Sequence, residues 1–148
     1  MTANVHGVTI FCDDVRNEVG NKYSLMGCYG SDMVVGLIPS LLPKLCAQIT
    51  VFFPADEPPS CLIARALLGD EVIGELITPE GDPRRIAEQL IADHDDVEKI
   101  TMQVILVFSP LSISEPATLR IEIEADGETV RAGRLKIRTR EEGATPQS

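Results

Sequence analysis

The chain has 148 residues, a formal net charge of −10, 44% apolar residues and 24% charged residues. These values are ordinary for one soluble globular domain with a sizeable core, and they exclude wholesale disorder. Tryptophan is absent and aromatic residues make up only 4%, which predicts an aliphatic core and argues against an aromatic platform for stacking single-stranded bases.

The first third of the chain predicts four strands. Apolar alternation indicates strands over residues 5–12, 23–29, 33–37 and 45–53. Residues 13–22 between the first two are expected to form an ordered, charge-rich loop at one end of a sheet. Pro39 and Pro43 bracket a connection that cannot be a central strand, because proline has no N–H to donate.

The middle of the chain predicts a hairpin followed by one short helix. Residues 61–68 and 72–77 form the expected hairpin, and residues 82–92 form the expected helix. Asp82 can accept hydrogen bonds as the N-cap, and Pro83 at the first helical position loses none. Three turns are too few for a stable isolated helix, so this one must pack on the sheets.

The last third predicts a central strand over residues 100–108 and a hairpin that closes at Asp126-Gly127. On residues 118–125 we expect Leu119, Ile121 and Ile123 to face the core. The inward positions of the returning strand change parity after Ala132, so an extra residue is needed, and we place a β-bulge at Gly133. The tail, residues 141–148, is expected to be disordered.

Together these elements predict an all-β, immunoglobulin-like antiparallel β-sandwich of about seven or eight strands with one short helix near residues 82–92. Residues 1–140 would form a single domain. A small β-barrel is the alternative fold.

The four cysteines are Cys12, Cys28, Cys46 and Cys61, and none belongs to a CxxC pair. Each lies among apolar neighbours, as a small buried hydrophobe would. A zinc or disulfide role requires that the fold bring them together. The amino terminus lacks the pattern of a signal peptide, and no window approaches the roughly 20 apolar residues of a membrane span, so reduced thiols in a cytoplasm are expected.

Several short motifs carry a resemblance to a known family. They are Phe11-Cys12-Asp13-Asp14-Val15-Arg16, Asn21-Lys22, Ile38-Pro39, Leu42-Pro43-Lys44-Leu45, Pro116-Ala117-Thr118-Leu119-Arg120-Ile121 and Asp126-Gly127-Glu128. The chain resembles a family of small bacterial and bacteriophage proteins of unknown function with a CDD-x-R…GK…LPKL pattern. The resemblance spans most of residues 8–137, with Asn21-Lys22 where the family has Gly-Lys. It implies a β-sandwich and supplies no catalytic residue.

A first candidate site is the charged segment between the first two strands, which contains Asp13, Asp14, Arg16, Glu18 and Lys22. These side chains could recognise a basic or polar ligand. The alternative is a network of salt bridges that fixes the loop, with exposed pairs worth about 0–1 kcal/mol each.

A second candidate is the acidic cluster after the helix, formed by Asp93, Asp95, Asp96 and Glu98. Clustered carboxylates on a loop suit a hard cation, so calcium is the ion such a site would take. The spacing does not match an EF-hand loop, and the alternative is a solvated acidic loop.

A third candidate is the basic run Arg134, Lys136, Arg138 and Arg140, which share one strand face. Residues 1–130 carry 21 acidic and 8 basic side chains, so this run stands out against an acidic body. That body makes nucleic-acid and membrane binding unfavourable. The remaining interpretations are cross-strand pairing, such as Glu122 opposite Arg131, with cations that guard a sheet edge, or docking against an acidic partner or a second copy.

The chain contains no GxSxG, P-loop or HExxH motif, and only two histidines, so we expect no enzymatic activity. The preferred hypothesis is a cytoplasmic β-sandwich that binds another protein or itself, related to bacterial or phage proteins and needing no cofactor. The alternative is a metal- or small-ligand-binding domain that uses an acidic end loop, with a hydrolase as a weaker third hypothesis.

Overall fold

The computed structural model describes residues 4–140, most of which lie in strands. The strands are β1 (His6–Glu18), β2 (Lys22–Cys28), β3 (Asp32–Val35), β4 (Ser40–Leu42), β5 (Leu45–Pro54), β6 (Leu62–Leu68), β7 (Glu71–Ile77), β8 (Lys99–Phe108), β9 (Leu111–Ile113), β10 (Ala117–Ala125) and β11 (Glu128–Thr139). The helix α1 (Asp82–Asp93) connects β7 to β8. The expected tail over residues 141–148 lies outside the described residues.

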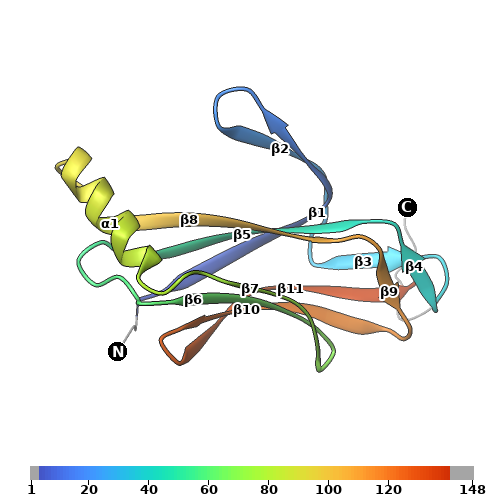
Figure 1. Cartoon of the computed structure of the whole chain (residues 1–148). Coiled ribbons are helices and arrows are strands. Elements are labelled where there is room, and N and C mark those ends of the chain that lie inside the picture. Colours follow the sequence, from blue (N-terminus) through green and yellow to red (C-terminus); the bar gives the residue numbers. More distant parts are fainter. Residues whose placement is uncertain (1–3, 141–148) are drawn as a thin grey trace.

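The strands form two stacked sheets and one small ladder (Figure 1). The four-stranded sheet has the order β2-β1-β5-β8, and the five-stranded sheet has the order β3-β11-β10-β6-β7. Strands β4 and β9 pair at one end of the stack, and α1 lies at the opposite end. The mainly-β prediction is therefore confirmed, and the alternative of a closed barrel is wrong.

Two details of the predicted sandwich need correction. The described residues contain eleven strands rather than seven or eight, and two of the additional ones are the short strands β4 and β9 of the proline-bracketed segments. The sheets are also not wholly antiparallel, since β3 runs parallel to β11 along residues Lys136–Thr139. Strand β3 follows the crossover that carries the chain from β2 in the four-stranded sheet to the five-stranded sheet.

The core between the sheets is aliphatic, as the composition predicts. Leu119, Ile121 and Ile123 of β10 are all 0% exposed, and Leu135 and Ile137 of β11 are equally buried. Side chains on alternate positions of each strand enter this layer because successive residues of a strand point to opposite faces.

The predicted β-bulge is confirmed. Ile121 pairs with Gly133 and Glu122 with Arg131, so Ala132 is the extra residue of β11. Gly133 has φ +144°, which disfavours any side chain. A Cβ at this position would lie 2.9 Å from the Cβ of Thr9, so the bulge also lets β1 approach β11 closely.

The helix is confirmed, but its N-cap is Gly81 and not Asp82. Gly81 adopts φ 84°, and its carbonyl accepts the first helical hydrogen bond from Arg85 N–H. Asp82 instead forms an ion pair with Arg85 at 2.6 Å. Pro83 and Ala87 are buried against the sheets, which supplies the packing that so short a helix needs. Within residues 4–140, no helix has the length and apolar character to cross a membrane.

The expected loop over residues 13–22 is wrong, because strand β1 continues through most of it to Glu18. The chain turns at Gly20 and Asn21, both with positive φ, and returns as β2. The distal part of β1 and β2 form a hairpin that rises from the four-stranded sheet (Figure 1). Near its tip, the Tyr23 hydroxyl contacts Gln48 at 3.0 Å and Gln103 at 2.6 Å, so the hairpin leans over the outer face of β5 and β8.

The first prediction concerns the bulge. Gly133→Ala should lower the free energy of unfolding by about 1–3 kcal/mol, because the new Cβ meets Thr9 on a backbone that disfavours it. Urea titration followed by circular dichroism measures this. Gly36→Ala is the matched control, since a Cβ there has no atom within 4 Å, and it should stay within about 0.5 kcal/mol of the wild type. Equal effects of the two changes would contradict the close approach.

The second prediction concerns the buried Thr9 Oγ1, which has no hydrogen-bond partner among the described residues. Thr9→Val should leave stability unchanged or raise it by up to about 1 kcal/mol, because it removes an unsatisfied polar group at constant shape. Thr9→Ser keeps the hydroxyl and loses a packed methyl group, so it should cost about 1 kcal/mol. The same urea titration distinguishes the two; a destabilised Thr9→Val would show that the hydroxyl has a partner.

Candidate functional site

The charged residues of the β1–β2 hairpin are mostly paired with one another or with neighbouring strands. Asp14 forms an ion pair with Lys44 at 2.6 Å. Arg16 donates to Glu18 at 2.9 Å, and Ser24 Oγ donates to the same carboxylate at 2.6 Å. These contacts are the salt-bridge network that the sequence offered as the alternative to a recognition surface.

The pKa values of these groups follow from the contacts. The hydrogen bond from Lys44 holds the pKa of Asp14 below its usual range, and Ser24 and then Arg16 do the same for the pKa of Glu18. Burial, with a hydrogen bond to Asp13, raises the pKa of Tyr29 to about 12. The carboxylates of Asp14 and Glu18 are therefore held ionised by internal donors and are already occupied by these contacts.

Lys22 differs from its neighbours, because no ion pair involves it among residues 4–140. It lines a shallow hollow at the hairpin tip with Glu18 and Tyr23. A single exposed lysine beside a carboxylate supplies no defined ligand chemistry.

The carboxylates of the acidic cluster after the helix are not grouped as metal ligands among the described residues. Asp93 is the last residue of α1, whereas Asp95, Asp96 and Glu98 are exposed on the segment that leads to β8. Over the described range, no three His, Cys, Asp or Glu side chains are grouped so that they could hold a metal ion. The carboxylates therefore extend into solvent separately.

The basic run lies on the outer face of the five-stranded sheet. Alternation along β11 places Arg134, Lys136 and Arg138 on this face. Arg140 lies two residues after Arg138, just beyond the end of the strand. Arg120 of β10 is the register partner of Arg134 and therefore shares the face. We call Arg120, Arg131, Arg134, Lys136 and Arg138 the basic face.

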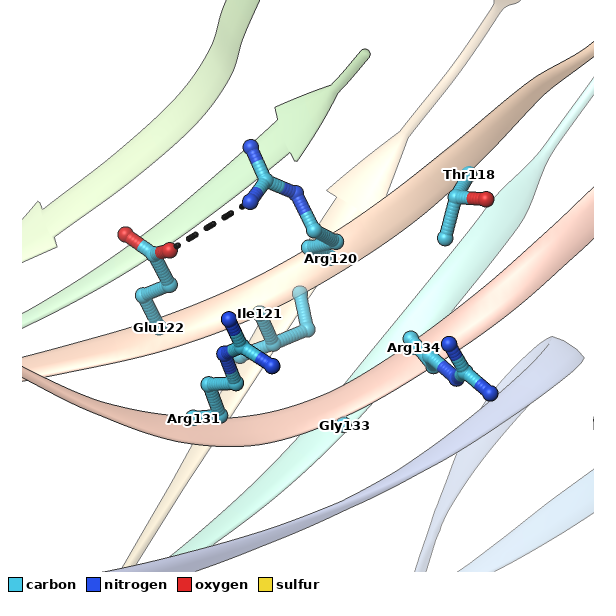
Figure 2. Close-up of a pocket in the computed structure, with 7 residues that line it drawn as sticks. All are labelled: Thr118, Arg120, Ile121, Glu122, Arg131, Gly133 and Arg134. Carbon is cyan, nitrogen blue, oxygen red and sulfur yellow. Dashed lines mark ion pairs between the residues drawn. The ribbon is translucent and has the colours of Figure 1, made fainter. Parts of the chain in front are cut away.

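A hollow of about 420 Å³ lies in the middle of the basic face (Figure 2). Its lining residues are Thr118, Arg120, Ile121, Glu122, Arg131, Gly133 and Arg134. Figure 2 shows the arginines rising from two adjacent strands, Arg120 from β10 and Arg131 and Arg134 from β11. Gly133 and its register partner Ile121 contribute to the lining from the backbone side, because both positions face the inner layer.

The ion pairs leave part of this positive charge unneutralised. Arg120 lies 3.8 Å from Glu122 and donates to the Gly69 carbonyl at 3.1 Å. Arg138 forms an ion pair with Asp32 at 2.9 Å, and this contact holds the pKa of Asp32 below its usual range. Within residues 4–140, Arg131 and Arg134 form no ion pair. The hollow therefore presents three guanidinium groups and one carboxylate.

This geometry corrects the simplest interpretation of the basic run. Strand β11 is not an edge along Lys136–Thr139, because β3 pairs with it there. Glu122 is opposite Arg131 as expected, but its carboxylate lies beside Arg120 instead. The sequence interpretation missed Arg120 and Arg131 as members of the face. The Asp126-Gly127 turn with the bulge at Gly133 fixes the register that could have identified them.

Three of the four cysteines also come together, since Cys12 of β1 is the register partner of both Cys28 and Cys46. Cys61 precedes β6 in the other sheet. No family model matches the chain, and no curated protein matches it.

The third prediction tests the hairpin network. Lys44→Ala should raise the pKa of Asp14, because the lysine hydrogen bond and charge favour the ionised carboxylate. The stability that this pair contributes is present above the unfolded-state pKa of about 3.9 and is lost as pH falls through the lower folded-state value. NMR titration of the Asp14 carboxyl carbon measures the shift.

Lys22→Ala is the matched control for this titration. It removes an exposed lysine of the same hairpin that has no ion pair among the described residues, so the pKa of Asp14 should not move. Equal shifts in both variants would show that general charge, and not the Lys44 contact, sets the titration.

Proposed function

We propose that this protein is a non-enzymatic binding module whose basic face binds an acidic segment of a partner protein. The observation that carries this proposal is the pair Arg131 and Arg134, which have no ion pair among the described residues although the chain has a net charge of −10. On an acidic protein, cations that its own carboxylates do not neutralise are available to a carboxylate from outside.

The hollow suits a carboxylate side chain in particular. A guanidinium group offers parallel N–H donors that match the two oxygens of a carboxylate. Arginines on both β10 and β11 can contact one acidic group from two sides. The Thr118 hydroxyl at the rim adds a neutral donor.

The charge distribution favours a protein partner over a nucleic acid. Residues 1–130 carry 21 acidic and only 8 basic side chains, so the body of the molecule repels a long polyanion. A short acidic segment can contact the basic face without reaching the acidic surface around it. A longer polyanion would also meet that acidic surface and be repelled by it.

Three broader predictions belong to this proposal. The immunoglobulin-like form of the sandwich is supported by the two stacked sheets and the aliphatic layer between them. The relation to small bacterial and phage proteins rests on the motifs of the sequence, and a cytoplasmic location belongs to the same proposal. The alternative function is a metal- or small-ligand-binding domain, and its metal-binding form has no grouped donors among residues 4–140 to support it.

The fourth prediction tests the basic face with a model acidic ligand. A fluorescein-labelled peptide of alternating Glu and Ser, about 12 residues long, should bind the wild-type protein at low ionic strength, as measured by fluorescence anisotropy. Arg131→Glu and Arg134→Glu should each weaken binding at least about tenfold, or about 1.4 kcal/mol, because each replaces an attraction with a repulsion.

Arg84→Glu supplies the matched control. Arg84 is exposed on α1, away from the basic face, and the substitution makes the same change in net charge. Its affinity should stay close to that of the wild type, and a peptide with Lys in place of Glu should not bind. An equal loss of peptide affinity in Arg84→Glu would assign the effect to net charge. Tighter binding of a single-stranded oligonucleotide than of the acidic peptide would favour a nucleic-acid ligand. Either result would overturn the proposal.

A further inference from the structure

The four-stranded sheet places three cysteines in one row. Cys28 on β2, Cys12 on β1 and Cys46 on β5 are directly opposite one another across three neighbouring strands. Side chains of directly opposite residues project from the same face of a sheet. The three thiols therefore lie side by side on the outer face, at the base of the projecting hairpin.

The backbone hydrogen bonds distinguish the two pairs. Tyr29 N–H donates to the Phe11 carbonyl at 2.8 Å, and this bond flanks Cys12 and Cys28, which makes them a non-hydrogen-bonded pair. The Cα atoms of such a pair lie about 4.5 Å apart, with the side chains close together, whereas those of a hydrogen-bonded pair lie about 5.5 Å apart. The N–H and C=O of one strand residue point to the same side. Since those of Cys12 do not bond to β2, they point toward β5, and Cys12 and Cys46 are a hydrogen-bonded pair. Disulfides span Cα separations of about 4.4–6.8 Å, so both pairs are permitted, and the exposure of the thiols decides between them.

Exposure assigns different roles to these thiols. Cys12 and Cys46 are both 0% exposed, whereas Cys28 is exposed. Burial, with Cys46 and Cys28 nearby, raises the pKa of Cys12 to about 11, and burial also raises the pKa of Cys46. The buried thiols therefore stay protonated, and Cys28 is the thiol that a dissolved oxidant reaches first.

We propose that Cys28 and Cys12 form a modification site, a reversible cross-strand disulfide made by hydrogen peroxide or an organic hydroperoxide. The Cys28 thiolate attacks one peroxide oxygen, the O–O bond breaks, and Cys28 becomes a sulfenic acid while the other oxygen leaves as water or an alcohol after protonation. The Cys12 sulfur then attacks the Cys28 sulfur, the S–O bond breaks, and water leaves with the Cys12 proton. Two thiols are oxidised by two electrons, and one hydroperoxide is reduced by two.

The disulfide would staple the hairpin at its base. It would join the end of β2 to the middle of β1, beside the hydrogen bond from Tyr29 to Asp13. Restricting the unfolded chain between the two cysteines should raise the melting temperature. Metal capture is a less suitable chemistry for this row, because no three His, Cys, Asp or Glu side chains among residues 4–140 are grouped to hold an ion.

The fifth prediction uses tryptic mapping of the folded protein after treatment with hydrogen peroxide. Trypsin separates Cys12, Cys28 and Cys46 onto fragments 1–16, 23–44 and 45–65. The intact mass should fall by two hydrogen atoms, fragment 1–16 should be linked to fragment 23–44, and dithiothreitol should reverse the link. Cys28→Ser should abolish the link, whereas Cys61→Ser, a change just before β6 of the other sheet, should leave its yield unchanged.

Three outcomes would overturn the proposal. Fragment 1–16 could be linked to fragment 45–65 in place of 23–44, which would assign the disulfide to one of the two cysteines of that fragment, Cys46 or Cys61. Cys28 could be joined only to Cys28 of a second molecule, or it could gain oxygen atoms without forming any link. The wild-type map distinguishes these outcomes even where a cysteine variant fails to fold.

Discussion

The close packing of β1 on the bulged part of β11 is the contact on which the rest of the structure depends. A Cβ at Gly7 would lie 2.3 Å from Ile123 Cδ1, and one at Gly133 would lie 2.9 Å from the Cβ of Thr9, so the two sheets approach as closely as they can at this edge. The same bulge moves Arg131 and Arg134 onto one outer face, where both line the hollow. One extra residue in β11 thus shapes both the core contact and the proposed binding surface, which agrees with the frequent use of bulges to redirect side chains.

The outer faces of the two sheets differ in chemistry. That of the five-stranded sheet is charged, and its arginines are partly neutralised by Asp32, Glu122 and other carboxylates. That of the four-stranded sheet carries the thiol row and Gln48, which is only 4% exposed because Tyr23 of the hairpin covers it. The hairpin charges pair among themselves or with Lys44, so they set the geometry of the hairpin. The functional proposals therefore fall on different layers and can succeed or fail separately.

Some predictions of local structure from the sequence are wrong for identifiable physical reasons. A ten-residue charged segment is typical of a loop, but cross-strand partners such as Ser24 and Glu18 stabilise these polar residues as strand. Asp82 has the side chain of an N-cap, yet Gly81 takes the position because its backbone reaches φ 84° without strain. Proline-bracketed residues were excluded from a central strand correctly, but β4 and β9 pair as a separate short ladder that needs few donors.

Local pattern alone determined the aliphatic core, the inward set Leu119, Ile121 and Ile123, the turn at Asp126-Gly127 and the bulge at Gly133. Each of these depends on neighbours in the chain, through the two-residue period of a strand or the backbone freedom of a turn. Tertiary structure decided which strands pair across the layers, and so it alone brought Cys46 to Cys12, Lys44 to Asp14 and Arg138 to Asp32. Such pairings join residues about 30 to 106 positions apart in the chain, and their choice rests on how whole sheets bury apolar area, which no single stretch of sequence encodes.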